Sequence, residues 1–490
     1  MLALLIPGPL SPGNDIHVYL QPLIKDLKEL WEVGLETYDS LSNQRFDMHA
    51  TLMSTISDFP AYAMLSGWST KGKIACPACH YETESLFFNK SHKHCYMGHP
   101  TFLDLSHPWR RNKRYFIGVT GQRHQPVRLT GIETKELLCG FRNKCGKLQK
   151  ITKQEKEVPW KRVPIFFKLP YWKHCSLRHN LDVMHIEKNV CDNIIATLLD
   201  LPGKSKDHAN VRQDLKALNW MPELHPQLLE DGKEVFPKSR FSMSLEEKRL
   251  FCQVIKNAKL PLGYASNIAR CVQVGERKIT GYKSHDAHFL MHYLLLVAIK
   301  TTLSKDVAKP LLRLCAFFKG IWKKAIDPQD LDYLQTEIVE TLCQLEEIFP
   351  PTFFDVMVHL PIHLVEEIKL GGPVGIRCMY AIERYLRELK SDVRNKGRPE
   401  GSMAERYLAK ECLAFCGRYL NRSNNPSDNN AVDPSISNTL FPNIGRPIRG
   451  KGRNRKKKDY GFMMDHITRA QVHQYVLFNC DSEEVERYIE

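Results

Sequence analysis

Long hydrophobic runs are absent from this sequence. No stretch reaches the roughly 18 apolar residues that a membrane-spanning helix needs, and the apolar start is stopped at Pro7 with no basic residues before it. We therefore expect neither a membrane span nor an export signal. The 490 residues are nevertheless 43% apolar, which is too much for a disordered chain and enough for about two or three packed units.

Common catalytic and binding motifs are missing as well. The chain has no glycine-rich phosphate-binding loop, no Ser/His/Asp motif and no aromatic-glycine RNA-binding motif. A disulfide framework is not expected, because the 15 cysteines are odd in number and scattered, apart from the pair Cys76 and Cys79. Reduced thiols predict a protein of the cytosol or nucleus.

Positive charge is in excess. The chain has 70 Lys and Arg against 55 Asp and Glu, a balance that favours polyanionic partners, of which nucleic acid is the commonest. Eight basic residues fall within 446–458, beside an Asn-, Ser- and Pro-rich stretch. This segment predicts an arm that contacts DNA phosphates or a nuclear localisation signal, and a solvated linker is the alternative. The candidate DNA contacts are Arg449, Lys451, Arg453, Arg455, Lys456, Lys457 and Lys458.

The first 60 or so residues have an α/β pattern. The apolar run 1–6 predicts a buried strand, and helical spacing extends from Asp15 to about residue 36. Residues 46–59 have the composition of another strand, which ends at Asp58. Residues 80–175 are irregular. From about residue 181 helical spacing recurs in segments that begin at residues 184, 244, 286, 306, 330, 377 and 404. The predicted fold class is therefore α/β plus a large all-α insertion.

The pair Cys76-Pro-Ala-Cys79 has the spacing of half a zinc site. Two thiolates at this spacing can occupy adjacent corners of a tetrahedron around Zn²⁺. Because there is no second pair of this kind, histidines would have to complete the site. By spacing, His174 with His179 and His359 with His363 are equal candidates, and two incidental thiols are the alternative.

Single carboxylates indicate a functional site less strongly than the cysteine pair does. Asp58 at a strand end lies where α/β sheets place catalytic groups, but the residues alone favour an ordinary helix or turn cap. Glu187 and Glu383 lie in helical patterns, where a lone glutamate is more often solvated or ion-paired. Three histidines share one helix face and indicate either a buried stripe or a metal site: His285, His288 and His292.

Several stretches resemble a known family. "LIPGPLSPGNDIHVYLQPLIKDL", "TISDFPAYAMLSGWSTKGKIACPAC" and "RHNLDVMHIEKNVCDNI" are similar to the transposases of plant CACTA-type (En/Spm-like) DNA transposons. "FFDVMVHLPIHLVEEIKLGGPVGIRCMYAIERYL" resembles the domain of unknown function that usually follows them. The resemblance implies a ribonuclease H-like DDE/D nuclease, in which three carboxylates hold two Mg²⁺ or Mn²⁺ ions.

The resemblance also assigns residues. It implies that Asp58 is the second catalytic acid and Glu383 the third. The V(D)J recombinase and its transposon relatives have a Cys-x2-Cys pair after the second acid, a helical insertion, a histidine pair and then the final glutamate. The same order here implies a structural Zn²⁺ site made of Cys76, Cys79, His359 and His363, and the alternative set is His179 and His185 with Glu187.

The resemblance also implies a division of the chain into five parts. It comprises a partial ribonuclease H-like core (1–75), a Cys/His-rich insertion (76–175), a helical insertion (176–350), a helical return segment (351–420), and a flexible basic segment with the tail (421–490). Strands 1 and 2 of the family's core, with the first acid, have no counterpart in the sequence, since this chain begins at strand 3.

We therefore expect a nuclear, transposon-derived protein that binds the terminal repeats of transposon DNA and is inactive alone. Homo-oligomerisation is compatible with this expectation. The alternative is a domesticated zinc-dependent factor that binds DNA or protein without nuclease activity.

Overall fold

The computed structural model describes residues 2–8, 11–39, 41–112, 116, 123–143, 158–230, 234–258 and 267–423. The chain divides into two compact units, Met1–Glu405 and Arg406–Glu490. The described part of the second unit ends at Ser423, the last residue of helix α16 (Pro399–Ser423), which begins within the first unit. The basic arm at 446–458 lies outside the described residues, and the finer five-part division stays a prediction.

The N-terminal helix is confirmed, but the strands beside it are shorter than predicted or missing. A short turn (Gly13–Asp15) leads into α1 (Ile16–Tyr19) and α2 (Gln21–Glu32), followed by the antiparallel hairpin β1 (Leu35–Asp39) and β2 (Gln44–Met48). The strand predicted at residues 1–6 is wrong, since residues 2–8 form no regular element. Leu4 and Ile6 instead pack on a buried cluster that includes Ile24 and Trp172, so their burial does not require strand pairing.

The strand predicted before Asp58 is reduced to β2 and to β3 (Thr55–Ile56). β3 pairs in parallel with β6 (His179–Asn180), with Thr55 opposite His179. This pairing joins segments that lie far apart in the sequence. The other described sheets are short hairpins: β4 (Leu86–Phe88) with β5 (Lys93–Cys95), β7 (Gln227–Leu228) with β8 (Glu234–Val235), and β9 (Val272–Gln273) with β10 (Lys278–Ile279).

In the described part of the segment between β3 and β6 the helices are short, as its irregular sequence predicts. They are α3 (Phe59–Ser66), α4 (Gly131–Leu137) and the 3-10 turns η2 (His80–Glu82), η3 (His99–Phe102), η4 (Pro108–Arg111), η5 (Ile165–Lys168) and η6 (Trp172–His174). The described structure is therefore mixed α/β and largely helical.

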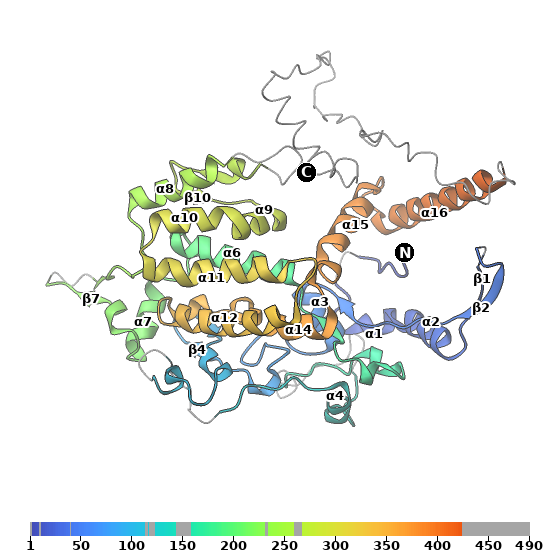
Figure 1. Ribbon diagram of the computed structural model, residues 1–490, viewed down its shortest axis with the longest axis horizontal. Helices are drawn as coiled ribbons and strands as arrows, with labels where there is room; N and C mark the ends of the chain where they lie inside the picture. The colour runs from blue at the N-terminus through green and yellow to red at the C-terminus, as the bar shows by residue number, and fades with distance from the viewer. Residues whose placement is uncertain are drawn as a thin grey trace, which may run out of the picture. The chain divides into compact units, whose positions relative to one another are not determined.

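The predicted helical block is confirmed and forms most of the core. Its helices are α6 (Val183–Leu198), α7 (Ala209–Ala217), α8 (Leu245–Lys256), α9 (Ser284–Phe289), the π-helix η9 (Leu290–Leu294), α10 (Leu295–Thr302), α11 (Lys305–Ile321) and α12 (Pro328–Glu346), with short turns η7 (Pro222–Leu224) and η8 (Ile268–Cys271). Figure 1 shows α8, α10, α11 and α12 in successive layers, and contacts join each to the next.

Capping residues explain where several of these helices begin. Ser244 and Glu247 form a capping box at the start of α8, and Asp327 caps α12 just before Pro328. One continuous cluster of buried apolar residues extends from α3 through this block to Cys378. Within the described residues, the helices are too short or too polar to cross a membrane.

The chain then returns along α12 toward β6. This return segment consists of η10 (Pro351–Phe353), α13 (Val356–His359), η11 (Leu360–His363), α14 (Leu364–Gly371), η12 (Val374–Ile376) and α15 (Met379–Ser391). Pro361 lies in the 3-10 turn η11, where the backbone passes from one helix to the next. The proline is thus accommodated without separating His359 from His363.

Candidate metal centre and carboxylate cluster

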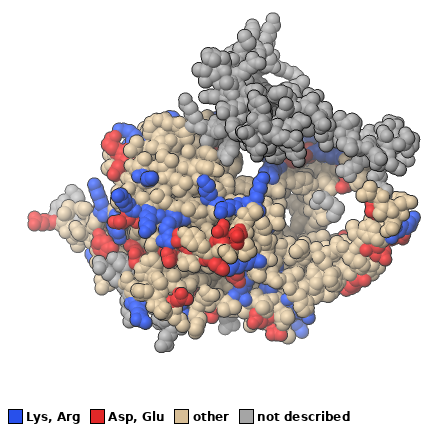
Figure 2. All heavy atoms as spheres, viewed as in Figure 1, with Lys and Arg blue, Asp and Glu red and all other residues tan. Residues whose placement is uncertain are grey.

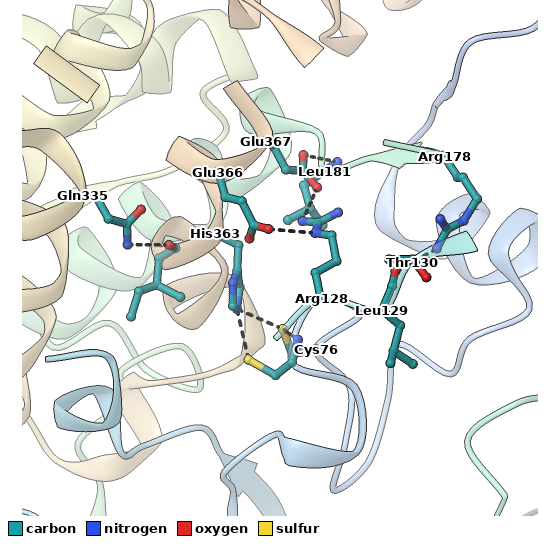
Figure 3. A network of polar contacts seen from close by, with 12 residues as sticks. Cys76, Arg128, Leu129, Thr130, Arg178, Leu181, Gln335, His363, Glu366 and Glu367 are labelled. Atoms are coloured by element: carbon teal, nitrogen blue, oxygen red, sulfur yellow. Dashed lines mark hydrogen bonds and ion pairs between the residues drawn. The ribbon is translucent and has the colours of Figure 1, made fainter. Parts of the chain in front are cut away.

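The four predicted zinc ligands converge in the core. Cys76 and Cys79 come from the loop after α3, while His359 ends α13 and His363 ends η11. All four residues are buried, and one ligand atom of each lies within 4.8 Å of the others. Figure 3 shows His363 directed at the Cys76 sulfur.

The spacing of these atoms suits a tetrahedral ion. The two histidine Nε2 atoms are 3.3 Å apart, and the sulfur-to-nitrogen distances are 3.3 Å (Cys76–His363), 3.4 Å (Cys79–His359) and 3.1 Å (Cys79–His363). A tetrahedral Zn²⁺ separates two nitrogens by about 3.4 Å and a nitrogen from a sulfur by about 3.6 Å. The set is therefore a possible Cys/His metal-binding cluster that is compatible with zinc.

The two thiols differ in acidity. Burial opposes ionisation of Cys76, but the hydrogen bond with Cys79 and the nearby His363 and His359 together lower its pKa well below the usual range. Burial and the neighbouring Cys76 raise the pKa of Cys79 well above that range. Two thiolates can coexist in such a buried space only if a cation compensates their charge.

A buried relay stands behind His359. The His359 Nδ1 lies 3.3 Å from the His99 Nε2, and the His99 Nδ1 contacts the Glu346 carboxylate, which also accepts the His99 backbone N–H at 3.0 Å. The side chains of His99 and Glu346 are fully buried. If His99 donates from Nδ1 to Glu346, its Nε2 accepts the His359 Nδ1–H, which leaves the His359 Nε2 lone pair free for the metal.

Sequence reasoning missed both relay residues. His99 lies in η3, in the irregular insertion, where no spacing rule applies. Glu346 could have been noticed in the sequence, because it lies on the apolar side of α12, next to Leu345. A glutamate at such a position is rarely buried without a specific partner.

Of the two predicted catalytic acids, Asp58 caps a helix and Glu383 lies within one. Asp58 follows β3 by two residues and caps α3, accepting the backbone N–H of Ala61 at 2.8 Å. Asp182 follows β6 by two residues and caps α6 in the same way. Because β3 and β6 run in parallel, both aspartates lie at the carboxyl end of the pair. Glu383, the other predicted acid, lies within α15.

His185 bridges Asp182 and Glu383. The His185 Nδ1 contacts Asp182, and its Nε2 lies 3.4 Å from a Glu383 carboxylate oxygen. The hydrogen bond that His185 donates to Asp182 raises the pKa of His185 against the effect of burial, and the charges of Asp182, Glu383 and Asp58 act in the same direction. Asp182 also accepts the Met379 backbone N–H at 2.9 Å, which fixes the start of α15. His185 therefore bridges Asp182 and Glu383, and together with Asp58 these residues are called the carboxylate cluster.

The alternative metal ligands are not brought together. His179 bonds through Nδ1 to the Thr55 hydroxyl at 2.7 Å and is surrounded by aromatic rings. His185 belongs to the carboxylate cluster, whereas Glu187 bonds to histidines of α9 and η9. His174 is exposed.

A buried ionic network joins the metal centre to β6. Glu367, one turn after His363, is fully buried and binds the Arg128 guanidinium at 2.9 Å and the Leu181 N–H at 3.0 Å. Arg377 approaches the same carboxylate at 3.4 Å. Figure 3 shows this network beside the cysteine loop. Because Leu181 directly precedes the aspartate that caps α6, the network positions the carboxylate cluster relative to the metal centre.

Charge on the described surface is mixed. In Figure 2, lysine and arginine side chains gather over the helical block with acidic side chains among them. Lys305 and Lys309 of α11 are exposed, but Arg313 on the same helix is paired with Glu337 and Glu340 at 2.8 Å. This face therefore gives no uniform basic surface.

Two protein-family models match parts of this chain. Residues 1–139 match the family model described as "Transposase family tnp2". Residues 321–431 match the model of a "Domain of unknown function (DUF4218)". The predicted combination is confirmed: the chain carries a tnp2-family transposase region and, C-terminal to it, this domain of unknown function. No curated protein and no solved structure matches the chain.

The metal centre is built across the two matched regions. The transposase region supplies Cys76 and Cys79, and the domain of unknown function supplies His359 and His363. The predicted acids are divided in the same way, with Asp58 in the first region and Glu383 in the second. This division explains why neither region alone contains a complete set of ligands.

Proposed function

We propose that the chain is the transposase of a CACTA-type (En/Spm-like) DNA transposon, and that it acts on DNA through a ribonuclease H-like nuclease site. The single observation that carries this proposal is that parallel strands place Asp58 and Asp182 at the same end, where His185 bridges Asp182 to Glu383. Family resemblance assigned Asp58 and Glu383, and they come from separate regions of the chain.

The local topology supports the proposed core. In α/β sheets, functional groups lie at the carboxyl ends of parallel strands. Asp58 and Asp182 follow two parallel strands at that end, and Glu383 approaches from helix α15. Bound Mg²⁺ or Mn²⁺ would supply an activated water for cleavage of a phosphodiester bond. Asp58 and Glu383 would hold the ion, and His185 would position Glu383.

We still expect that these 490 residues do not cleave DNA by themselves. A two-ion mechanism uses an acid that bridges both ions. Asp182 is a further carboxylate in this cluster, but one of its oxygens accepts the Met379 N–H and the other accepts from His185. Asp182 is thus committed to capping and positioning.

We also propose that the Cys/His centre holds Zn²⁺ in a structural role. Its four ligands leave no open position for substrate, as in structural rather than catalytic zinc sites. The ion would fasten the domain of unknown function to the transposase region, and so bring Glu383 toward Asp58.

Mn²⁺ binding tests the proposed nuclease site. Free Mn²⁺ is measured by electron paramagnetic resonance in separate samples of the wild-type full chain, the Asp58→Asn variant and the Glu383→Gln variant. Asparagine retains the cap of α3, so a loss of binding in Asp58→Asn reports the carboxylate charge rather than the fold. Asp306→Asn and Glu223→Gln change exposed acids outside the cluster and serve as matched controls.

We expect both cluster variants to weaken Mn²⁺ binding by tenfold or more, and both controls to leave it unchanged. Equal binding by all five proteins would remove the basis for a nuclease site. The zinc-dependent DNA- or protein-interaction factor would then be the better account.

A further inference from the structure

A second group of metal-type ligands lies apart from the Cys/His centre. Glu187 of α6 faces His288 of α9 and His292 of the π-helix η9. One carboxylate oxygen lies 2.8 Å from the His292 Nε2, and the other lies 2.9 Å from the His288 Nδ1. All three ligand atoms are within 4.8 Å of one another.

The charge of Glu187 needs compensation. Its side chain is 1% exposed, and among the described residues its polar partners include His288, His292 and the Trp322 indole N–H at 3.1 Å. A buried carboxylate is costly unless positive charge lies beside it. The two imidazole rings lie beside it with their centroids 3.8 Å apart, and a divalent ion bound between the carboxylate and the rings would supply that positive charge.

The donor set selects the kind of ion. Two imidazole nitrogens and one carboxylate suit Zn²⁺ and related transition-metal ions, whereas Mg²⁺ and Ca²⁺ prefer oxygen ligands. Around a tetrahedral ion of this kind a nitrogen and a carboxylate oxygen lie about 3.3–3.4 Å apart, so the atoms now 2.8 and 2.9 Å apart would separate by about 0.5 Å to admit the ion. The side chain of His288 is 31% exposed, which gives an ion and a water ligand access from solvent.

The surroundings have the features of a supported site. The Trp322 N–H donates to the same carboxylate oxygen as His288 contacts, an outer contact that orients a ligating carboxylate. The helix that carries the histidines changes to π geometry at Leu290, and such π segments occur frequently at functional sites. Tyr380 of α15 packs on the His288 and Trp322 rings.

We propose that Glu187, His288 and His292 form a second metal site, which binds a divalent transition-metal ion of the Zn²⁺ class. The ion joins α6 to α9 and η9. Because α6 begins at Val183, directly after Asp182, and carries His185 two residues before Glu187, the ion also stabilises the helix that supports the carboxylate cluster. The proposal does not rest on the nuclease function.

Cobalt substitution separates the two sites. The full chain is stripped with a chelator and titrated with Co²⁺, and bound cobalt and the absorption spectrum are measured together. Of the two ligand sets, the Cys/His centre alone has thiolates, so it alone gives a thiolate-to-cobalt charge-transfer band. We expect the wild type to bind one Co²⁺ ion with this band and one band-free ion at Glu187, His288 and His292, while any Co²⁺ at Asp58 and Glu383 is identified by its loss from Asp58→Asn.

Variants assign each ion. Glu187→Gln preserves shape and removes the charge, and it should lose the ion without the band while the band remains. His288→Ala with His292→Ala should do the same, whereas His285→Ala, an exposed histidine on the same helix, should bind as the wild type does. Cys76→Ser with Cys79→Ser should lose the band and keep the second ion.

The cysteine variant leaves the proposed second site intact, so it tests the proposal even if a histidine variant fails to fold. Absence of a band-free ion from both the wild type and the cysteine variant would overturn the second site. Retention of that ion by folded Glu187→Gln would also overturn it. Neither result bears on Mn²⁺ binding by Asp58 and Glu383.

Discussion

The buried relay behind His359 predicts that a residue without any metal contact sets the affinity for zinc. Glu346 lies beyond His99, so it reaches the metal centre only through two imidazole rings. Glu346→Gln keeps the size of the side chain and an oxygen that can accept from His99, but it removes the negative charge. The His99 and His359 tautomers are then held less firmly, and His359 becomes a weaker ligand.

The expected magnitude follows from comparable outer partners of metal ligands. Removal of such a partner lowers metal affinity about 10- to 100-fold, which is about 1.4–2.7 kcal/mol. The assay is competition for Zn²⁺ against a chromophoric chelator, with the full chain at neutral pH. Glu347→Gln is the matched control, because the same chemical change is made one residue along the chain, on a partly exposed side chain.

A double variant tests whether the residues act in series. If Glu346 acts through His99, then Glu346→Gln combined with His99→Gln should weaken zinc binding little more than His99→Gln alone. Additive losses, or a Glu346→Gln affinity within about twofold of the wild type, would refute the relay. Circular dichroism of each variant separates a lost relay from a lost fold.

Three further predictions concern stability and DNA binding. Glu367→Gln should cost about 3 kcal/mol in the free energy of unfolding by denaturant, because it leaves the largely buried Arg128 with only the more distant, half-exposed Glu366 as a counter-charge. Glu366→Gln should cost less than about 1 kcal/mol, and equal costs would contradict the network. Burial lowers the pKa of His179 to about 3, below the unfolded value of about 6.5, so its contribution is fully present above pH 6.5 and declines as the pH falls toward 3. His179→Gln should therefore lose less stability than the wild type between about pH 6.5 and 4, and parallel losses would show that His179 takes up a proton while folded. Deletion of 446–458 should weaken binding to all DNA sequences about equally and reduce the salt slope by up to about 0.9 for each phosphate that the arm neutralises, and an unchanged slope would leave the nuclear-signal or linker interpretation.

Sequence patterns predicted helices well and strands poorly, for a physical reason. A helix of three or more turns repeats its apolar side several times, so α6, α11 and α12 were evident. β3 and β6 are two residues each, which is too short for any alternation to show. Their pairing depends on tertiary contacts between distant segments, and residue order alone does not encode which segments meet.

The metal ligands were predictable because their order matched a family pattern, although spacing alone left two histidine pairs equal. The structure gathers His359 and His363 with the cysteines and places His179 elsewhere. For Asp58 both predicted features are present: it caps α3, and it lies at the carboxyl end of the parallel pair β3 and β6. Residue order gives no indication of the role of Asp182, because it gains its partners only when β6 and α15 meet.

Zinc is proposed to join the transposase region to the domain of unknown function through Cys76, Cys79, His359 and His363. The most direct test is the zinc content of the purified full chain, measured by atomic emission, together with zinc-edge X-ray absorption. Cys76→Ser and His363→Ala should each lower the content by about one ion per chain, and the wild-type spectrum should show sulfur ligands. Cys139→Ser and His174→Ala, at exposed positions, should change neither quantity. An unchanged zinc content in Cys76→Ser and His363→Ala, with no sulfur around the wild-type ion, would contradict the account.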